Sequence, residues 1–253
     1  MLNTAPVLRL GITALVCAAI AASAMAGEPL FPKPLHIVRR IDDPVAGKAI
    51  TVHEYCAGSR IATVNGDRVA IVDYEAQRIV EIDRGAGTYS VTRFEEAAKA
   101  QPRAAGAAKM QGALRMTKAD MYEARFDSDA KLEIGVDRRF ELSRDAVEAL
   151  IGAAYPSERH PEHDALLEAA RGPRDRVASQ SKDAQTEHYA LPASQITTYS
   201  TEGREIVLKN TIVAVSNELA PADVLAIPPG ARQVESRITR AARELQALDA
   251  IPK

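Results

Sequence analysis

Residues 60–94 read RIATVNGDRVAIVDYEAQRIVEIDRGAGTYSVTRF, and this stretch decides the fold class. Its runs of Val, Ile, Thr and Tyr are separated by turn residues, of which Asn65-Gly66 is the clearest pair. Such runs are typical of β-strands, and Asn-Gly tolerates the positive φ of a tight hairpin. Evenly spaced short strands with short turns favour an antiparallel sheet. The expected strands are Arg60–Asn65, Arg68–Tyr74, Arg78–Asp83 and Thr88–Phe94.

The same pattern continues on both sides of this stretch. Upstream, Leu35–Asp42 and Ile50–Cys56 have the composition of two further strands. Downstream, apolar and polar residues alternate through residues 122–126 and again through residues 132–142. This period of two predicts a pair of strands with one buried face and one solvent-exposed face. The apolar positions of the pair are Tyr122, Ala124, Phe126, Leu132, Ile134, Val136, Phe140 and Leu142.

Helical segments are expected between and after the strands. Glu95–Ala100 could form a short helix, and Ser143 has the character of an N-cap for a helix that ends before Pro156. A further short helix is expected near His163–Ala170. With the polar residues that follow, the last two helices form a helical and loop insertion at about residues 143–185.

The last third of the chain returns to strands and ends in a helix. Strands are expected at Glu187–Leu191 and Gln195–Tyr199, and Arg204–Ser216 is expected to be a strand that is buried on both faces. Apolar residues then recur at a spacing of four and three, which predicts an amphipathic C-terminal helix. Its stripe consists of Val234, Ile238, Ala241, Leu245 and Leu248. The expected fold is therefore α+β and mainly antiparallel β.

The first 26 residues differ in character from all of this. Arg9 precedes a 13-residue apolar run, Leu10–Ala22, and small residues follow up to Ala24-Met25-Ala26. This is the pattern of a secretory signal peptide, and the run is shorter than the roughly 20 residues of a spanning helix. We expect cleavage near Ala26, a single mature domain at residues 27–253 without a membrane span, and a periplasmic or secreted location.

Charge and motifs exclude several functions. The net charge is −2 with both signs evenly mixed, which argues against nucleic acid as a partner. We find no Gly-rich phosphate loop and no G-x-S-x-G nucleophile motif, so no cofactor and no catalytic residue is expected. His160 and His163 are weak metal-ligand candidates, because an exposed polar loop also gathers such residues. Cys56, alone once the leader with Cys17 is removed, is either a small buried residue or a free thiol for intermolecular pairing.

Two segments resemble a known family. In Val69–Thr92, VAIVDYEAQRIVEIDRGAGTYSVT, two strands end in Asp73 and Asp83 and a third opens near Tyr89. This piece, and the sequence Ala226–Gly230, are similar to the periplasmic lipoprotein-carrier-like half-barrel superfamily, which includes secreted members of unknown function. The resemblance implies a curved half-barrel sheet with helices packed on one side, and several members hold acyl chains or protein partners there. No catalytic residue follows from it, and the segment at residues 143–185 departs from the pattern.

These observations lead to one main functional hypothesis. The chain is expected to be a non-enzymatic exported module that binds an apolar ligand (an acyl chain or a lipoprotein-like segment) or a protein partner in the cell envelope. The alternatives are an envelope structural or interaction protein with a filled core, and a metal-dependent hydrolase that uses His160 and His163. The candidate ligand-lining residues are Tyr122, Phe126, Leu132, Ile134, Val136 and Phe140.

Overall fold

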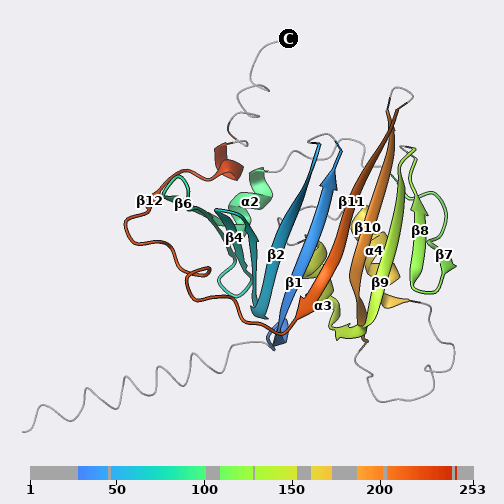
Figure 1. Cartoon of the computed structure of the whole chain (residues 1–253), viewed down its shortest axis with the longest axis horizontal. Helices are drawn as coiled ribbons and strands as arrows, with labels where there is room; N and C mark the ends of the chain where they lie inside the picture. The colour runs from blue at the N-terminus through green and yellow to red at the C-terminus, as the bar shows by residue number, and fades with distance from the viewer. Residues whose placement is uncertain are drawn as a thin grey trace, which may run out of the picture.

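The computed structural model contains one open sheet of twelve strands, which is antiparallel except for one short pairing at its edge (Figure 1). The structure describes residues 28–44, 47–100, 109–127, 129–152, 161–172, 187–201, 204–240 and 243. The strand order is β12-β6-β5-β4-β3-β2-β1-β11-β10-β9-β8-β7. The strand β1 (Phe31–Asp43) lies inside the sheet, between β2 (Lys48–Gly58) and β11 (Arg204–Ser216). The prediction of a mainly antiparallel β fold is confirmed.

The first half of the chain is a meander. After β2 come β3 (Arg60–Asn65), β4 (Arg68–Asp73), β5 (Arg78–Asp83) and β6 (Thr88–Arg93), each paired with its predecessor. These bounds agree with the sequence prediction to within one residue. The β3–β4 hairpin, however, is offset by one residue from the expected Asn65-Gly66 turn. Asn65 pairs with Arg68, so the two central residues are Gly66 and Asp67, and Gly66 takes the positive φ of 58°.

Two further turns of the meander share one design. Oδ1 of Asp73 accepts a hydrogen bond from the backbone N–H of Ala76 at 2.9 Å, and Asp83 receives the same bond from Ala86 at 2.9 Å. The residue after each alanine has a left-handed backbone: Gln77 has a φ of 49°, and its counterpart after Ala86 is a glycine. An aspartate at the strand end therefore organises each reversal through its side chain.

The second half builds the other side of the sheet. Its strands are β7 (Arg115–Lys118), β8 (Met121–Arg125), β9 (Lys131–Leu142), β10 (Tyr189–Thr201) and then β11. Two corrections to the prediction arise here. The expected strands at 187–191 and 195–199 are one strand, β10, with register shifts on both sides of Leu191-Pro192. The strand β7 was not predicted at all, because its four residues show no alternation.

Three helices are described in full. They are α2 (Phe94–Ala100), α3 (Arg144–Gly152) and α4 (Pro161–Arg171). Ser143 caps α3 as predicted, since its Oγ accepts a hydrogen bond from the N–H of Ala146 at 3.1 Å. Both α3 and α4 lie on the same face of the sheet (Figure 1), and we call this face the helix side and the opposite face the outer face.

Residues 217–231, which we call the strap, cross the outer face. They leave the end of β11 and reach β12 (Arg232–Gln233), which pairs in parallel with β6 (Figure 1). On the way, Ala220 and Val224 pack against the outer face of β3–β6, in a cluster with Ala62, Ile71 and Val80.

The strap leaves β11 itself uncovered, and no residue of β11 is fully buried. The prediction that Arg204–Ser216 is buried on both faces is therefore wrong.

The predicted C-terminal helix is described only at its start. Residues 237–240 are helical, and Ser236 caps them by accepting a hydrogen bond from the N–H of Thr239 at 3.0 Å. Val234 precedes this helix and is bonded to β6 through Tyr89, so it is not part of the helical stripe. Ala241, Leu245 and Leu248 lie outside the described residues, as do the leader, residues 1–26, and the end of the predicted insertion.

Candidate functional site

The predicted ligand-lining residues lie under α4. Five of them form one buried cluster on the helix side, together with Ala165, Leu166 and Ala169 of α4; the five are Tyr122, Phe126, Leu132, Ile134 and Val136. Leu132 and Ile134 are completely excluded from solvent. Phe140 is half-buried and packs instead against the cluster beneath α3. The structure thus brings five of the six candidates together, with a helix of the chain itself against them.

The helices that cover this surface belong to one insertion between neighbouring strands. Because β9 and β10 are adjacent and antiparallel, a tight hairpin of about two to five residues could join them. Instead, residues 143–188 separate them and carry both α3 and α4. The covering layer is therefore connected to the sheet through the two strand ends, and non-covalent contacts with the sheet hold α3 and α4 in place.

A band of polar side chains crosses the helix side next to the apolar clusters. The strand register fixes its position: Ile37, which packs beneath α3, pairs with Glu54, and Glu54 in turn pairs with Thr63. Glu81 pairs with Ser90 further along the sheet. We call this the polar band; its members are Gln195, Asn210, Arg39, Glu54, Thr63, Glu81 and Ser90. Sequence reasoning missed it, although Arg39 interrupts the apolar row Leu35, Ile37, Ile41.

An ion pair that is largely shielded from solvent lies in the middle of the polar band. Nε of Arg39 donates to Oε2 of Glu54 at 2.7 Å, and the two side chains are only 10% and 13% exposed. Beyond Arg39, Oδ1 of Asn210 is buried without a hydrogen-bond partner. Glu81 accepts a hydrogen bond from the Ser90 hydroxyl at 3.2 Å. Burial of polar groups costs desolvation free energy. Hydrophobic packing alone therefore does not explain why these polar residues lie on the helix side.

Cys56 and Tyr74 lie where α3 meets the sheet. Cys56 is 1% exposed, and burial, with a smaller contribution from the charge of Glu54, raises the pKa of its thiol to about 12. The Tyr74 hydroxyl donates to the carbonyl of Ala149 in α3 at 3.2 Å, and burial raises its pKa to about 12. The structure thus places Cys56 as a buried small residue, and Tyr74 ties α3 to the turn after β4.

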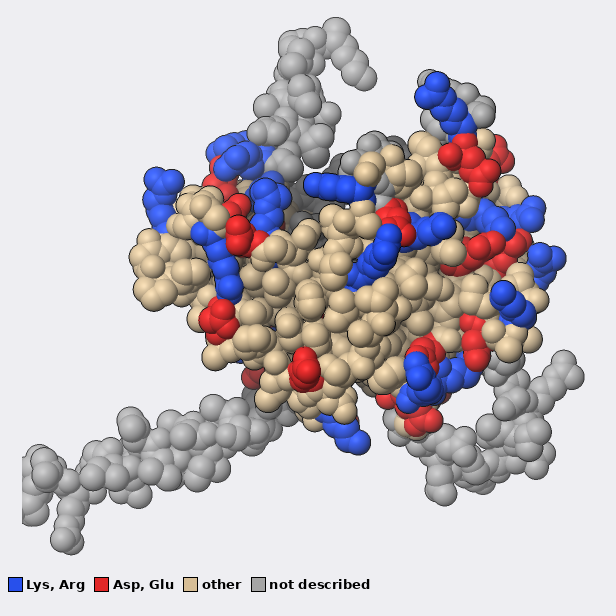
Figure 2. All heavy atoms as spheres, in the orientation of Figure 1, with Lys and Arg blue, Asp and Glu red and all other residues tan. Residues whose placement is uncertain are grey.

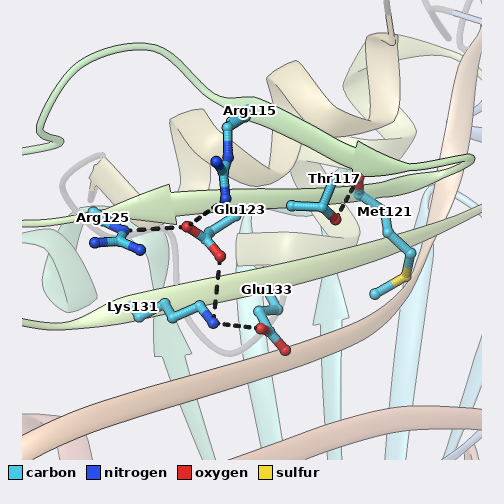
Figure 3. Close-up of polar contacts among 7 residues, drawn as sticks. All are labelled: Arg115, Thr117, Met121, Glu123, Arg125, Lys131 and Glu133. Carbon is cyan, nitrogen blue, oxygen red and sulfur yellow. Dashed lines mark hydrogen bonds and ion pairs between the residues drawn. The ribbon is translucent and has the colours of Figure 1, made fainter.

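The outer face of β7–β9 carries an ion-pair network (Figure 3). Glu123, 9% exposed, lies between three cations: Arg125 at 3.1 Å, Lys131 at 3.3 Å and Arg115 at 3.4 Å. Burial pushes the pKa of Glu123 up, but the hydrogen bonds from Arg125 and Lys131 and the charge of Arg115 outweigh it, so its pKa lies below the ordinary value. Lys131 also contacts Glu133 at 2.6 Å. The network of three cations and two carboxylates links the three strands of this sheet edge.

A second cluster on the outer face surrounds His36. Its Nδ1 lies 3.2 Å from Oγ of Ser216 and 3.3 Å from a carboxylate oxygen of Glu218, and its Nε2 lies 3.1 Å from Nδ1 of His53. The Tyr55 ring stacks on His36 at 4.2 Å. In the tautomer with a hydrogen on Nδ1, this nitrogen donates to the Glu218 carboxylate and cannot accept the proton of the Ser216 hydroxyl.

The middle of the outer face bears few charges. Figure 2, in the orientation of Figure 1, shows uncharged side chains over the central strands, with Lys and Arg mainly around the rim. Large exposed apolar side chains gather at the end of β11 and along the strap, namely Val213, Leu219, Leu225 and Ile227.

The metal hypothesis finds no support in the described part of the chain. No group of three or more His, Cys, Asp or Glu residues there has the geometry to hold a metal ion. His163 lies in α4, and His160 falls outside the described residues. No helix among the described residues has the length and apolar character to span a membrane.

Comparison with known proteins adds little. No family model and no curated protein sequence matches this chain. Among solved structures, one described as "Structure of PNGF-II in C2 space group" aligns at 9% identity with a TM-score of 0.35. The alignment covers 84% of this chain and 33% of that one, so this chain spans about a third of its length. A TM-score at this level does not indicate a shared fold.

Proposed function

We propose that this protein is a non-enzymatic binding module that holds an apolar chain between the helix side of its sheet and the layer formed by α3 and α4. The observation that carries the proposal is the insertion at residues 143–188, which contains α3 and α4, the two helices that pack on the apolar sheet surface. A curved half-barrel with helices on its concave side, as in lipoprotein-carrier-like proteins, is the architecture we propose for this arrangement. The ligand is an acyl chain or an apolar segment of a lipoprotein.

The amino-acid composition of α3 and α4 supports a mechanism in which an acyl chain displaces these helices from the sheet. Of the nine buried residues that α3 and α4 contribute to the clusters, five are alanines, namely Ala146, Ala149, Ala165, Ala169 and Ala170, and the others are Val147, Leu150, Leu166 and Leu167. An alanine buries little apolar area, whereas each methylene of an acyl chain contributes about 0.8 kcal/mol on leaving water. An acyl chain of about a dozen carbons would therefore gain roughly 10 kcal/mol on leaving water, which offsets lost contacts of the displaced helices.

The proposal includes export. The apolar run Leu10–Ala22 and the Ala24-Met25-Ala26 ending motivate it. Expression in a bacterial host with a periplasm, followed by N-terminal sequencing of the periplasmic fraction, tests it. A mature start near Gly27 is expected; a cytoplasmic product that retains residues 1–26 contradicts export.

The binding proposal is tested on the mature protein. Native mass spectrometry of protein purified from its own envelope should detect a bound acyl compound. Delipidated protein should then take up a dansyl-labelled fatty acid, with saturation at one equivalent. A uniformly empty protein that takes up no probe would rule out the acyl ligand.

One variant connects uptake to the helical cover. Tyr74→Phe removes the hydroxyl that bonds to Ala149 of α3 and leaves the ring in place. Uptake should become faster by about two- to tenfold, the effect of one lost hydrogen bond of about 0.5–1.5 kcal/mol. The matched control is Tyr89→Phe, whose hydroxyl makes only a long contact of 3.4 Å with Gln233. Equal uptake rates in both variants would contradict a role for α3 as a cover.

A further inference from the structure

The polar band offers an unfilled hydrogen-bonding position beside the apolar surface. Asn210 pairs with Ile41 of β1 and with Gln195 of β10, which places it on the helix side. Its Oδ1 is shielded from solvent and has no hydrogen-bond partner. A buried polar atom without a partner costs free energy, and such atoms are rare in native proteins. The position is therefore suited to a hydrogen-bond donor that a ligand supplies.

Arg39 lies next to Asn210 on the neighbouring strand. It pairs with Ile212, two residues from Asn210, so the two Cα atoms are about 7–8 Å apart on the diagonal. Glu54 accepts from the Nε of Arg39, and the guanidinium carries further N–H donors on its two terminal nitrogens. The pair Asn210 and Arg39 thus combines an acceptor with donors on one short stretch of sheet.

The charges near this pair select against an anion. Glu54 neutralises Arg39 at 2.7 Å. A ligand carboxylate would therefore meet a cation that is already paired, with the Glu54 carboxylate beside it. A neutral group that both donates and accepts hydrogen bonds fits better, and an amide also satisfies Asn210 in either orientation of its side-chain amide.

This position borders both apolar clusters. Gln195, the partner of Asn210, pairs with Ile134 beneath α4, and Ile212, the partner of Arg39, packs in the cluster beneath α3. An acyl chain on the helix side could therefore place its head beside Asn210 without leaving the apolar surface.

We infer that Asn210 and Arg39 form the headgroup subsite for an amphiphile whose acyl chain carries a neutral amide. The inference rests on the proposed function. It goes beyond that proposal because it names the headgroup and predicts selectivity among ligands with the same chain.

Displacement of the dansyl-labelled fatty acid by three competitors of equal chain length tests this subsite. They are dodecanamide, dodecanoate and dodecane. The amide should compete about tenfold more strongly than the hydrocarbon, which corresponds to satisfying one buried polar atom. The carboxylate should also compete less well than the amide, because it has no hydrogen to donate to Oδ1 of Asn210.

The variant Asn210→Leu removes the unpaired oxygen and should fold at least as well as the natural protein. It should lose the preference for the amide over the hydrocarbon while it keeps its affinity for dodecane. Asn217→Leu is the matched control, since Asn217 is exposed just beyond the end of β11, and its amide preference should be unchanged.

The outcomes separate the two proposals. If neither the probe nor any competitor binds the natural protein, the proposed function fails and the subsite fails with it. If all three competitors bind but their order is the same in the natural protein and in Asn210→Leu, the subsite alone is wrong. A preference for dodecanoate over dodecanamide would also overturn it, since it would show an anion site.

Discussion

Removing one partner of the Arg39–Glu54 ion pair should destabilise the fold strongly, whereas removing both should not. The two side chains are about one-tenth exposed and in contact at 2.7 Å. Arg39→Met leaves the Glu54 carboxylate buried without a counter-ion. Such an unpaired buried charge lowers the free energy of unfolding by about 3–5 kcal/mol. This is a large share of the roughly 5–15 kcal/mol by which domains are stable. The double variant Arg39→Met/Glu54→Leu replaces the pair with apolar groups and should be close to neutral.

Urea unfolding followed by circular dichroism measures both effects. The two single variants and the double variant form a cycle whose coupling free energy should exceed about 2 kcal/mol. Arg40→Met is the control, because the Arg40–Asp42 pair is 59% and 42% exposed and should contribute at most about 1 kcal/mol. The reasoning is refuted if Arg39→Met costs no more than Arg40→Met, or if the double variant costs as much as the two single variants together.

Four further predictions follow from the described contacts. Gly135→Ala should destabilise by about 1–3 kcal/mol, because the added Cβ would lie too close to Oγ of Ser194, and Ser194→Ala should restore stability. Gln77→Gly should raise the free energy of unfolding by about 1 kcal/mol, since it relieves a left-handed backbone at a φ of 49°. Glu123→Gln should flatten the loss of stability in acid: the lowered pKa of Glu123 means that its stabilisation is present above the ordinary value of 4.5 and disappears as the pH falls through the native pKa. The Cys56 thiol, with its pKa raised to about 12, should react with Ellman's reagent only on unfolding.

Each of these has a control or a contradicting result. Ala76→Gly, one residue before Gln77, should not stabilise the protein, because no positive φ is relieved there. Glu141→Gln, at an exposed position of β9, should leave the acid profile unchanged. A stable Gly135→Ala variant would show that Ser194 moves aside at no cost. Labelling of Cys56 in the folded protein at the rate of a small free thiol would contradict its burial.

The half of the sheet formed by β2–β6 was predictable because its signals are local. Each of these strands pairs with its predecessor, and Asp73, Asp83 and Gly66 mark the reversals within a few residues. The other half depends on distant contacts. Pro192 reads as a break between two strands, yet it lies at a bulge of the single strand β10, where the missing N–H is tolerated.

The candidate site was predictable only in its apolar part. The alternation through Leu132 and Ile134 identified the side chains that α4 covers, because a period of two is visible in one strand. The polar band was not visible, because Arg39, Glu54 and Asn210 come from three different strands, one of which, β11, lies far from the other two in sequence. Which face an isolated polar residue takes depends on the neighbouring strands, and the register that decides it is a property of the folded sheet.

The central position of β1 has a consequence for the order in which the chain can fold. One edge of β1 pairs with β2 as soon as residue 58 is available, but the other edge must wait for residues 209–216 of β11. Between the synthesis of Arg93 and that of Ser216, about half of the chain length, the growing chain therefore has a complete meander with an open, hydrogen-bonding edge in the middle of the future sheet. Such edges recruit strands from other molecules. The protein should depend most on a holding chaperone in this interval, and truncation before β11 should yield aggregates instead of a soluble half-sheet.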